Sequence, residues 1–259
     1  MGHIRLGRLP ASRKWQDVVG LLSSGAPVDR IAGASAGAAQ ASLRHAHDDP
    51  ALVRSFWLLT QLPLAARSPD YLAALAGLGL AFDREPTLLE LTGSVVEAVD
   101  RHVGVTGGRT NLGEMAQLAA AESLAAVVGA GLPSLFGPTP GDVRSELGKY
   151  AGRDRFAVLA RDYFARLTNQ HLDYYLSREL SNHTGPHQSI ASTVGQTEFN
   201  EALAHYCREA SRIVVEFAGG WFSKTVFEGG ITPEKAGRFV FVALGKISRE
   251  LQQRAAADG

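Results

Sequence analysis

The sequence predicts an all-α protein, a multi-helix bundle with a long antiparallel helical hairpin in its C-terminal half. The first observation is a short polar residue followed by proline, a pair that caps a helix start and suits its first turn. The second is the capping-box pattern, in which a polar cap is followed three residues later by glutamate. The third is apolar spacing of three or four residues, with almost no alternation of period two. The pairs and boxes are Asp49-Pro50, Ser68-Pro69, Thr139-Pro140, Thr232-Pro233, Thr87…Glu90 and Asn111…Glu114.

These signals divide the chain into ten expected helices, and Pro63 is expected to end or kink the third. The hairpin is expected to consist of the eighth and ninth helices, because a short connection makes neighbouring helices antiparallel. The expected ranges are 13–24, 27–47, 50–62, 69–80, 87–103, 112–131, 140–150, 154–183, 197–218 and 233–255.

The best candidate for a domain boundary is the segment 131–141, "GLPSLFGPTPG", which is rich in proline and glycine. It separates an Ala-rich N-terminal helical region, 1–136, from a C-terminal helical bundle, 137–259. One continuous domain is the alternative. The stretch "IAGASAGAAQAS" is interpreted as tight helix packing rather than a linker, because small residues let helix backbones approach closely.

Composition excludes several functions. The 259 residues carry a formal net charge of zero, so the chain has no overall field to attract a polyanion. Cys207 is the only cysteine, so no intrachain disulfide and no multi-thiolate zinc site can form. The most apolar stretches are shorter than a bilayer requires, so we expect no membrane span and a cytoplasmic protein. The abundance of Arg and Ala over Lys favours a bacterial source.

The stretch "EFAGGWFSKTVFEGG" contains a Ser-Lys-Thr that is superficially similar to a phosphate-binding loop. A Walker A loop needs glycine where this chain has Ala218 and Ser223, and it should follow a strand. The stretch is therefore interpreted as a structural connection. Gly219 or Gly220 would end one helix in a left-handed C-cap, and Gly229-Gly230 would turn the chain toward the next.

In this interpretation Trp221 and Phe222 fold back onto the end of the helix, since buried aromatic residues mostly serve packing. The alternative is an exposed aromatic–lysine binding surface with Trp221 and Lys224 as its anchors.

Glutamate and histidine residues recur every four positions on the two helices of the expected hairpin. Glu179 and His183 share one helix face, as do Glu201 and His205 on the next. Together they form a chemically adequate set for a divalent metal, with Glu179, His183 and His205 as candidate catalytic residues. Neither the Glu-x-x-His pattern of di-iron bundles nor His-Glu-x-x-His is present. We therefore expect a structural polar layer without bound metal or other cofactor.

A basic N-terminal arm, "HIRLGRLPASRKW", carries Arg5, Arg8, Arg13 and Lys14, and no acid precedes Asp17. Such an arm can bind a phosphate backbone or an acidic partner. Nucleic-acid binding is expected only through this arm. The alternative is a solvated or docked terminus.

Because helix-packing signals are plentiful and catalytic spacing is missing, the sequence favours a non-enzymatic role. We predict a helical adaptor or accessory subunit of a bacterial protein assembly, acting with a protein partner or as a homo-oligomer. The alternative is a metal-dependent, hydrolase-like enzyme that uses the Glu/His layer. Elemental analysis of the purified protein separates the two.

Overall fold

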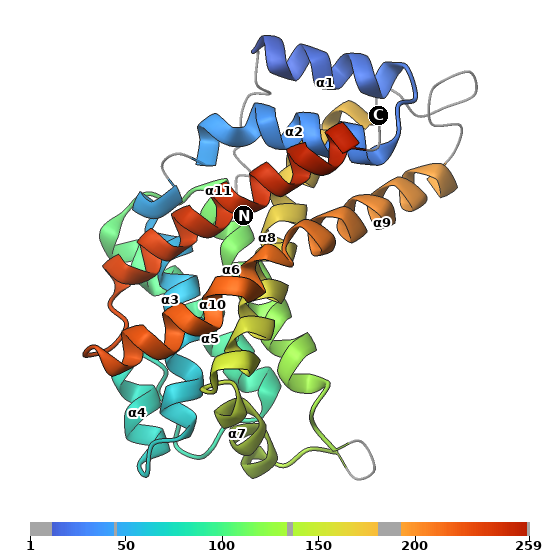
Figure 1. Cartoon of the computed structure of the whole chain (residues 1–259). Coiled ribbons are helices and arrows are strands. Elements are labelled where there is room, and N and C mark those ends of the chain that lie inside the picture. The colour runs from blue at the N-terminus through green and yellow to red at the C-terminus, as the bar shows by residue number, and fades with distance from the viewer. Residues whose placement is uncertain (1–11, 44–45, 134–136, 181–192, 258–259) are drawn as a thin grey trace.

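A computed structural model describes residues 12–43, 46–133, 137–180 and 193–257. These residues form eleven α-helices and no strand, so the all-α prediction is confirmed (Figure 1). The helices are α1 (Arg13–Ser23), α2 (Val28–Leu43), α3 (Pro50–Ala66), α4 (Tyr71–Gly77), α5 (Leu88–Thr106), α6 (Asn111–Ser123), α7 (Pro140–Lys149), α8 (Arg153–Leu180), α9 (Thr193–Ala210), α10 (Ile213–Phe227) and α11 (Pro233–Ala257). A 3₁₀ turn, Ala46–Asp48, precedes α3, and a π-helical segment, Leu124–Val128, extends α6.

Most helices begin where the capping signals predict. Asp49 accepts a hydrogen bond from the Leu52 amide at the start of α3, and Thr87 and Thr139 form complete capping boxes. Two caps differ from the prediction. The cap of α4 is Asp70 rather than Ser68, and the cap of α6 is Thr110 rather than Asn111. In each case a second capping residue lies within two positions of the first, and local pattern alone does not choose between them.

Two predicted helix ends are wrong. Pro63 does not end the third helix, because α3 continues to Ala66 with the proline buried inside it. The alternative, a kink at Pro63, stays a prediction. The single helix expected over 197–218 is two helices, since the chain turns at Ser211 and Arg212 between α9 and α10. At this turn the Cys207 carbonyl accepts from both the Ser211 hydroxyl, at 2.7 Å, and the Ser211 backbone amide, at 3.0 Å.

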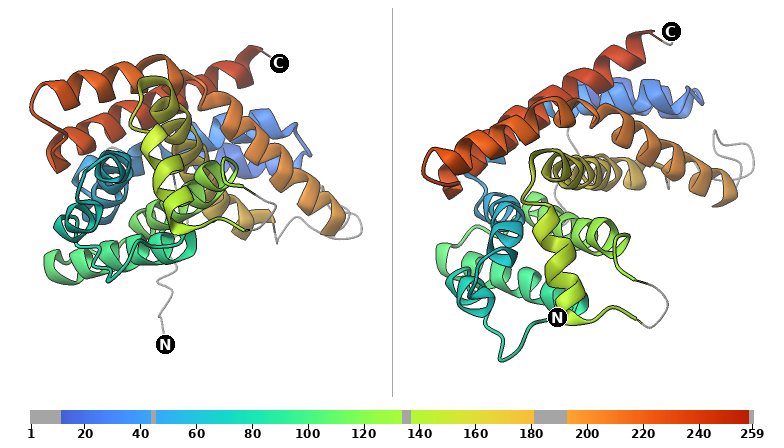
Figure 2. Two further views of the ribbon diagram at one scale, coloured as in Figure 1. Left: turned by 90° about the horizontal axis from the view of Figure 1, so that it is seen from below. Right: turned by 60° about the horizontal axis from the view of Figure 1, so that its bottom comes forward.

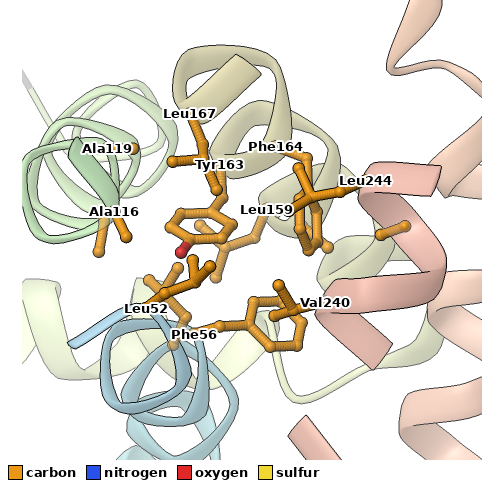
Figure 3. Packing of buried hydrophobic residues seen from close by; sticks show 14 of the residues in the cluster. Leu52, Phe56, Ala116, Ala119, Leu159, Tyr163, Phe164, Leu167, Val240 and Leu244 are labelled. Atoms are coloured by element: carbon orange, nitrogen blue, oxygen red, sulfur yellow. The ribbon is translucent and has the colours of Figure 1, made fainter. Parts of the chain in front are cut away.

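The buried α8 lies at the middle of the bundle. Figure 3 shows its side chains between α6 on one side and α11 on the other, with α3 beside them. Phe56 of α3 is fully buried at the centre, and its ring centroid lies 5.2 Å from those of both Phe164 and Phe239. We call the ring cluster around Phe56 the aromatic centre; its other members are Phe156, Tyr163, Phe164, Trp221 and Phe239.

Helices α2 and α11 cross on one face of the bundle, and α1 covers α2 (Figures 1 and 2). At the crossing, a Cβ added to Gly33 would overlap the Cβ of Ala255 and lie 3.0 Å from the Leu251 carbonyl oxygen. The two backbones therefore touch where a side chain is missing. This contact confirms the expectation that the Gly- and Ala-rich stretch serves tight packing.

The expected hairpin helices, α8 and α9, run antiparallel where they meet. Arg161, near the start of α8, donates to the carbonyl of Arg208 at 3.3 Å and lies 3.8 Å from Glu209. Further along α8, Asn169 shares a cavity wall with Ala204, one turn earlier on α9. The connecting residues 181–192 lie outside the described part of the chain, so the complete hairpin stays a prediction.

Buried apolar residues from Trp15 to Leu251 form one contiguous cluster. It includes side chains on both sides of the boundary proposed at 136/137, and the division into two regions stays a prediction. Within the described residues, none of the helices combines the length and apolarity that crossing a bilayer requires.

Candidate binding groove and the predicted site residues

An open groove of about 420 Å³ lies where α1, α2 and the end of α11 meet. Its floor is made of small residues, and its flanks carry polar and charged side chains. The lining residues are Lys14, Asp17, Leu21, Arg30, Gly33, Ala34, Gly37, Gln252, Ala255 and Ala256. We call it the α1/α2/α11 groove.

The groove exists because the sequence places glycine at the helix crossing. Gly33 lets α11 contact the backbone of α2, and Gly37, one turn later, has only the Gln252 side chain within 4 Å of where its Cβ would be. Helix α1 is held above α2 by its buried face, Trp15, Val18 and Leu22. Packing therefore fixes the three helices, and α11 covers Gly33 while the space beside Gly37 stays open.

The flanks of the groove carry more positive than negative charge. Lys14 of α1 and Arg30 of α2 are exposed, and neither forms an ion pair with a described residue. Asp17 is the single acid among the described lining residues. The Lys14 ammonium and the Arg30 guanidinium are therefore both available to an anionic group placed in the groove.

Only the last residues of the predicted basic arm belong to the described part of the chain. Arg13 is the first residue of α1 and is exposed, directly before Lys14. Arg5 and Arg8 lie outside the described residues. Of the three predicted arginines, only Arg13 is described, and it is the sequence neighbour of the groove residue Lys14. The binding role of the arm stays a prediction.

The connection at Gly219–Gly220 was wrongly predicted as a helix end. Both glycines lie inside α10, and a Cβ added at Gly219 would lie 2.5 Å from the Arg153 carbonyl oxygen. The glycine therefore serves close packing of α10 on the start of α8 rather than a left-handed cap. The turn predicted at Gly229-Gly230 is confirmed, with φ angles of 98° and 97°.

The two residues proposed as binding anchors in this stretch have different surroundings. Trp221 is half-buried, and its ring centroid lies 4.2 Å from that of Phe239. Lys224 is 73% exposed and lies 3.8 Å from Glu228 one turn later. Phe227, close by, is 92% exposed. A binding surface at Trp221 and Lys224 stays a hypothesis.

The turn between α10 and α11 is fixed to α3. The Trp57 indole N–H donates to the Ile231 carbonyl at 2.8 Å, and the Gln61 amide donates to the same oxygen at 3.3 Å. Ile231 is buried, and Thr232 then caps α11 through the Lys235 amide. These contacts are those of a structural connection between two helices.

The predicted Glu/His layer is partly described. Glu179 is half-buried on α8, and Glu201 and His205 are exposed on α9. His183 lies outside the described residues. Within the described chain, no three His, Cys, Asp or Glu side chains come together as a metal-ligand set. The four-residue layer therefore stays a prediction.

Two buried groups that could carry chemistry are held in inert forms. Cys207 is fully buried, and burial raises the pKa of its thiol to about 12. Burial also lowers the pKa of His171 to about 4, so its imidazole is neutral at physiological pH. Neither group is poised as a nucleophile or a base.

Sequence reasoning missed Arg30 and the α1/α2/α11 groove. A signal was present, because Gly33 and Gly37 are four residues apart and small residues at that spacing let a second helix approach. The partner helix, however, is more than two hundred residues away in the chain, and local pattern does not identify it. Comparisons with protein-family models, curated proteins and solved structures found no match to this chain.

Proposed function

We propose that this protein is a non-enzymatic helical adaptor that binds an acidic segment of a partner protein in the α1/α2/α11 groove. The observation that carries the proposal is the groove itself. It is a cavity of about 420 Å³ whose two cations, Lys14 and Arg30, have no ion-pair partner among the described residues.

The shape of the groove supports a chain segment as its occupant. Its volume is in the range of ligand sites, yet it is open along the sides of three helices instead of enclosing a small molecule. At Gly37 only the Gln252 side chain comes within 4 Å of where a Cβ would be, so the groove has room there for a side chain of a segment lying across it. Helical proteins commonly accept partner segments in grooves of this kind.

The charges support an acidic partner. The groove has two cations, Lys14 and Arg30, and one acid, Asp17. It therefore attracts a segment that carries carboxylates and repels a basic segment. Double-stranded nucleic acid is less well matched, because its affinity depends on many phosphate contacts and the chain has zero net charge. The basic arm residues Arg5, Arg8 and Arg13 would add to the same attraction.

The role that follows is that of an accessory subunit in a protein assembly. A single cysteine and a composition rich in Arg and Ala are compatible with the bacterial cytoplasm as its setting. A homo-oligomer is the other form that such an assembly can take.

Charge reversal tests the proposal. The probe is a short fluorescent peptide of glutamate and alanine, compared with one of lysine and alanine and with a single-stranded oligonucleotide. We expect the acidic peptide to bind, and Lys14→Glu combined with Arg30→Glu to weaken binding by about tenfold or more.

The matched control is Arg238→Glu with Arg249→Glu, which removes two exposed arginines from α11 outside the groove. Equal loss in both double variants would show a non-specific charge effect and contradict the proposal. Binding that Lys224→Glu abolishes, with the groove variants unaffected, would move the site to the Trp221 surface.

A further inference from the structure

Helix α9 carries two neighbouring acids whose charges are not neutralised by the described part of the chain. Glu198 and Glu201 are exposed, and their spacing of three residues places them on one face of the helix. Neither forms an ion pair with a described residue. Glu234 of α11, by contrast, is exposed and lies 2.5 Å from Arg238. We call Glu198 and Glu201 the acidic α9 pair.

The acidic α9 pair faces away from the bundle. Phe199, Leu203 and Cys207 form the buried face of α9, so the side chains between them in the sequence point to solvent. Like charges that share a helix face repel each other. Cations brought from outside the chain would relieve this repulsion.

The α1/α2/α11 groove and the acidic α9 pair belong to the same end of the molecule. Helix α9 packs on α2 and α11 and extends from the end of the bundle at which α1, α2 and the last turns of α11 meet (Figures 1 and 2). The acids nevertheless form no ion pair with Lys14 or Arg30 of their own chain. One end of the molecule therefore presents a basic groove and, beside it, an acidic helix face.

We propose that the acidic segment bound in the α1/α2/α11 groove is helix α9 of a second copy of this chain. The inference rests on the proposed function and names its partner. Glu198 and Glu201 of one copy lie beside Lys14 and Arg30 of the other. Residues three apart on a helix have Cβ atoms about 5–6 Å apart, so both carboxylates enter one groove together. The groove is open along three helices, so it receives side chains of a helix face without enclosing the helix.

The two surfaces are complementary in charge, and each copy carries both. Because they lie at the same end of the molecule, a two-fold axis between two copies places each α9 against the groove of the other. The chain has zero net charge, so no overall repulsion opposes the approach of two copies. An interface held mainly by exposed ion pairs is weak and weakens further in high salt.

Sedimentation of the full chain over a range of concentrations tests the inference through a charge swap. We expect the wild type to form dimers with a dissociation constant on the order of 100 μM in low salt. The groove variant is Lys14→Glu with Arg30→Glu, and the α9 variant is Glu198→Lys with Glu201→Lys. Each variant alone should associate at least about tenfold more weakly, because like charges then face each other.

An equimolar mixture of the two variants should recover the association. The native α9 of the groove variant meets the native groove of the α9 variant, and in the second contact both charges are reversed and still attract. Recovery in the mixture also shows that both variants are folded, which circular dichroism confirms. The matched control is Glu97→Lys with Glu234→Lys, whose native side chains are 72% and 73% exposed on α5 and α11. It makes the same change in net charge and should associate like the wild type.

Three results would overturn the inference: a wild type that stays monomeric at about ten times the expected dissociation constant, association unchanged in the α9 variant, or a mixture that does not recover it. The acidic glutamate–alanine peptide separates this inference from the proposed function. If the peptide binds the groove of a monomeric wild type, the groove takes a different acidic protein and only the second copy is excluded. If the peptide does not bind and the wild type is monomeric, both proposals fail.

Discussion

The aromatic centre and the crossing of α2 with α11 solve the same packing problem in opposite ways. Around Phe56, five ring contacts fill the space between helices that stand apart, with centroids from 5.2 to 6.4 Å away. At Gly33 the two helices touch through their backbones, because no side chain separates them. The first region is closed, and the second leaves the α1/α2/α11 groove open beside it.

The difference shows which region contributes more to the folding free energy and which leaves surface open to a partner. Large buried rings contribute apolar area and dispersion contacts, so the aromatic centre carries much of the folding free energy. A contact made of glycine and alanine buries little area per residue. The groove beside it is bordered by Lys14 and Arg30, which are exposed and form no ion pair with a described residue.

The largest expected effect is loss of the central ring. Phe56→Ala should lower the free energy of unfolding by about 3–5 kcal/mol, because Phe56 is fully buried among five rings and the cavity cannot collapse easily. Denaturant unfolding measures it. Phe227→Ala is the control, since that ring is 92% exposed, and its effect should stay within about 0.5 kcal/mol. Equal effects in the two variants would contradict the assigned aromatic centre.

The next effect concerns His171, which lies where α8 packs against the α2/α11 crossing. His171 of α8 lines a small void of about 20 Å³ together with Ala36 of α2 and Leu244 of α11. Burial lowers the pKa of His171 from 6.5 to about 4. Between these values the unfolded chain binds the proton that the folded chain excludes, so stability is complete above about pH 6.5 and falls as the pH drops toward 4.

The expected loss from His171 is about 3 kcal/mol, since one pKa unit corresponds to about 1.4 kcal/mol. Carboxylates titrate in the same range, so the measurement is the difference between the wild type and His171→Gln in urea unfolding across that pH range. His205→Gln, on an exposed position of α9, should follow the wild type. Identical pH profiles for the wild type and His171→Gln would show that His171 accepts a proton without unfolding.

Features that depend on neighbouring residues could be predicted from sequence, whereas features that depend on residues far apart in the chain could not. Helix starts are local, and Asp49, Thr87 and Thr139 cap as predicted. The turn at Ser211 was missed because it contains neither glycine nor proline. The glycines at 219 and 220 were taken for a helix end because a helical glycine that packs against Arg153 has the same local sequence as one that ends a helix.

The candidate sites depend on long-range contacts. Gly33 meets Ala255 only after the helices pack. The Gly- and Ala-rich stretch indicated tight packing but not its partner. Free cations such as Arg30 are also indistinguishable in sequence from the paired arginines on neighbouring helices. The α1/α2/α11 groove was therefore not predictable from spacing within one helix.

A smaller effect is expected at the helix crossing. Gly33→Ala should destabilise the protein by about 1 kcal/mol, because overlap with Ala255 and the Leu251 carbonyl outweighs the gain of about 1 kcal/mol in helix propensity. Gly93→Ala is the matched control, since Gly93 of α5 has nothing within 4 Å of its added Cβ and should be stabilised. Stabilisation in both variants would show that α2 and α11 do not touch at Gly33.

The smallest effect on stability is expected at the flanks of the groove, and it separates folding from binding. Lys14→Ala and Arg30→Ala should each change the free energy of unfolding by less than about 0.5 kcal/mol, because both side chains are exposed and pair with no described residue. Arg144→Ala is the contrasting control. Its guanidinium donates to the carbonyls of Ala66 and Ser68 and to Glu85 at 2.7 Å, so its loss should cost more than 1 kcal/mol. Thermal and denaturant unfolding give the comparison.

If removing Lys14 or Arg30 destabilised the protein as much as removing Arg144, these cations would serve the fold, and the groove would lose the charge that distinguishes it as a binding surface. If the two substitutions leave stability unchanged and weaken binding of the acidic peptide, Lys14 and Arg30 serve binding rather than folding.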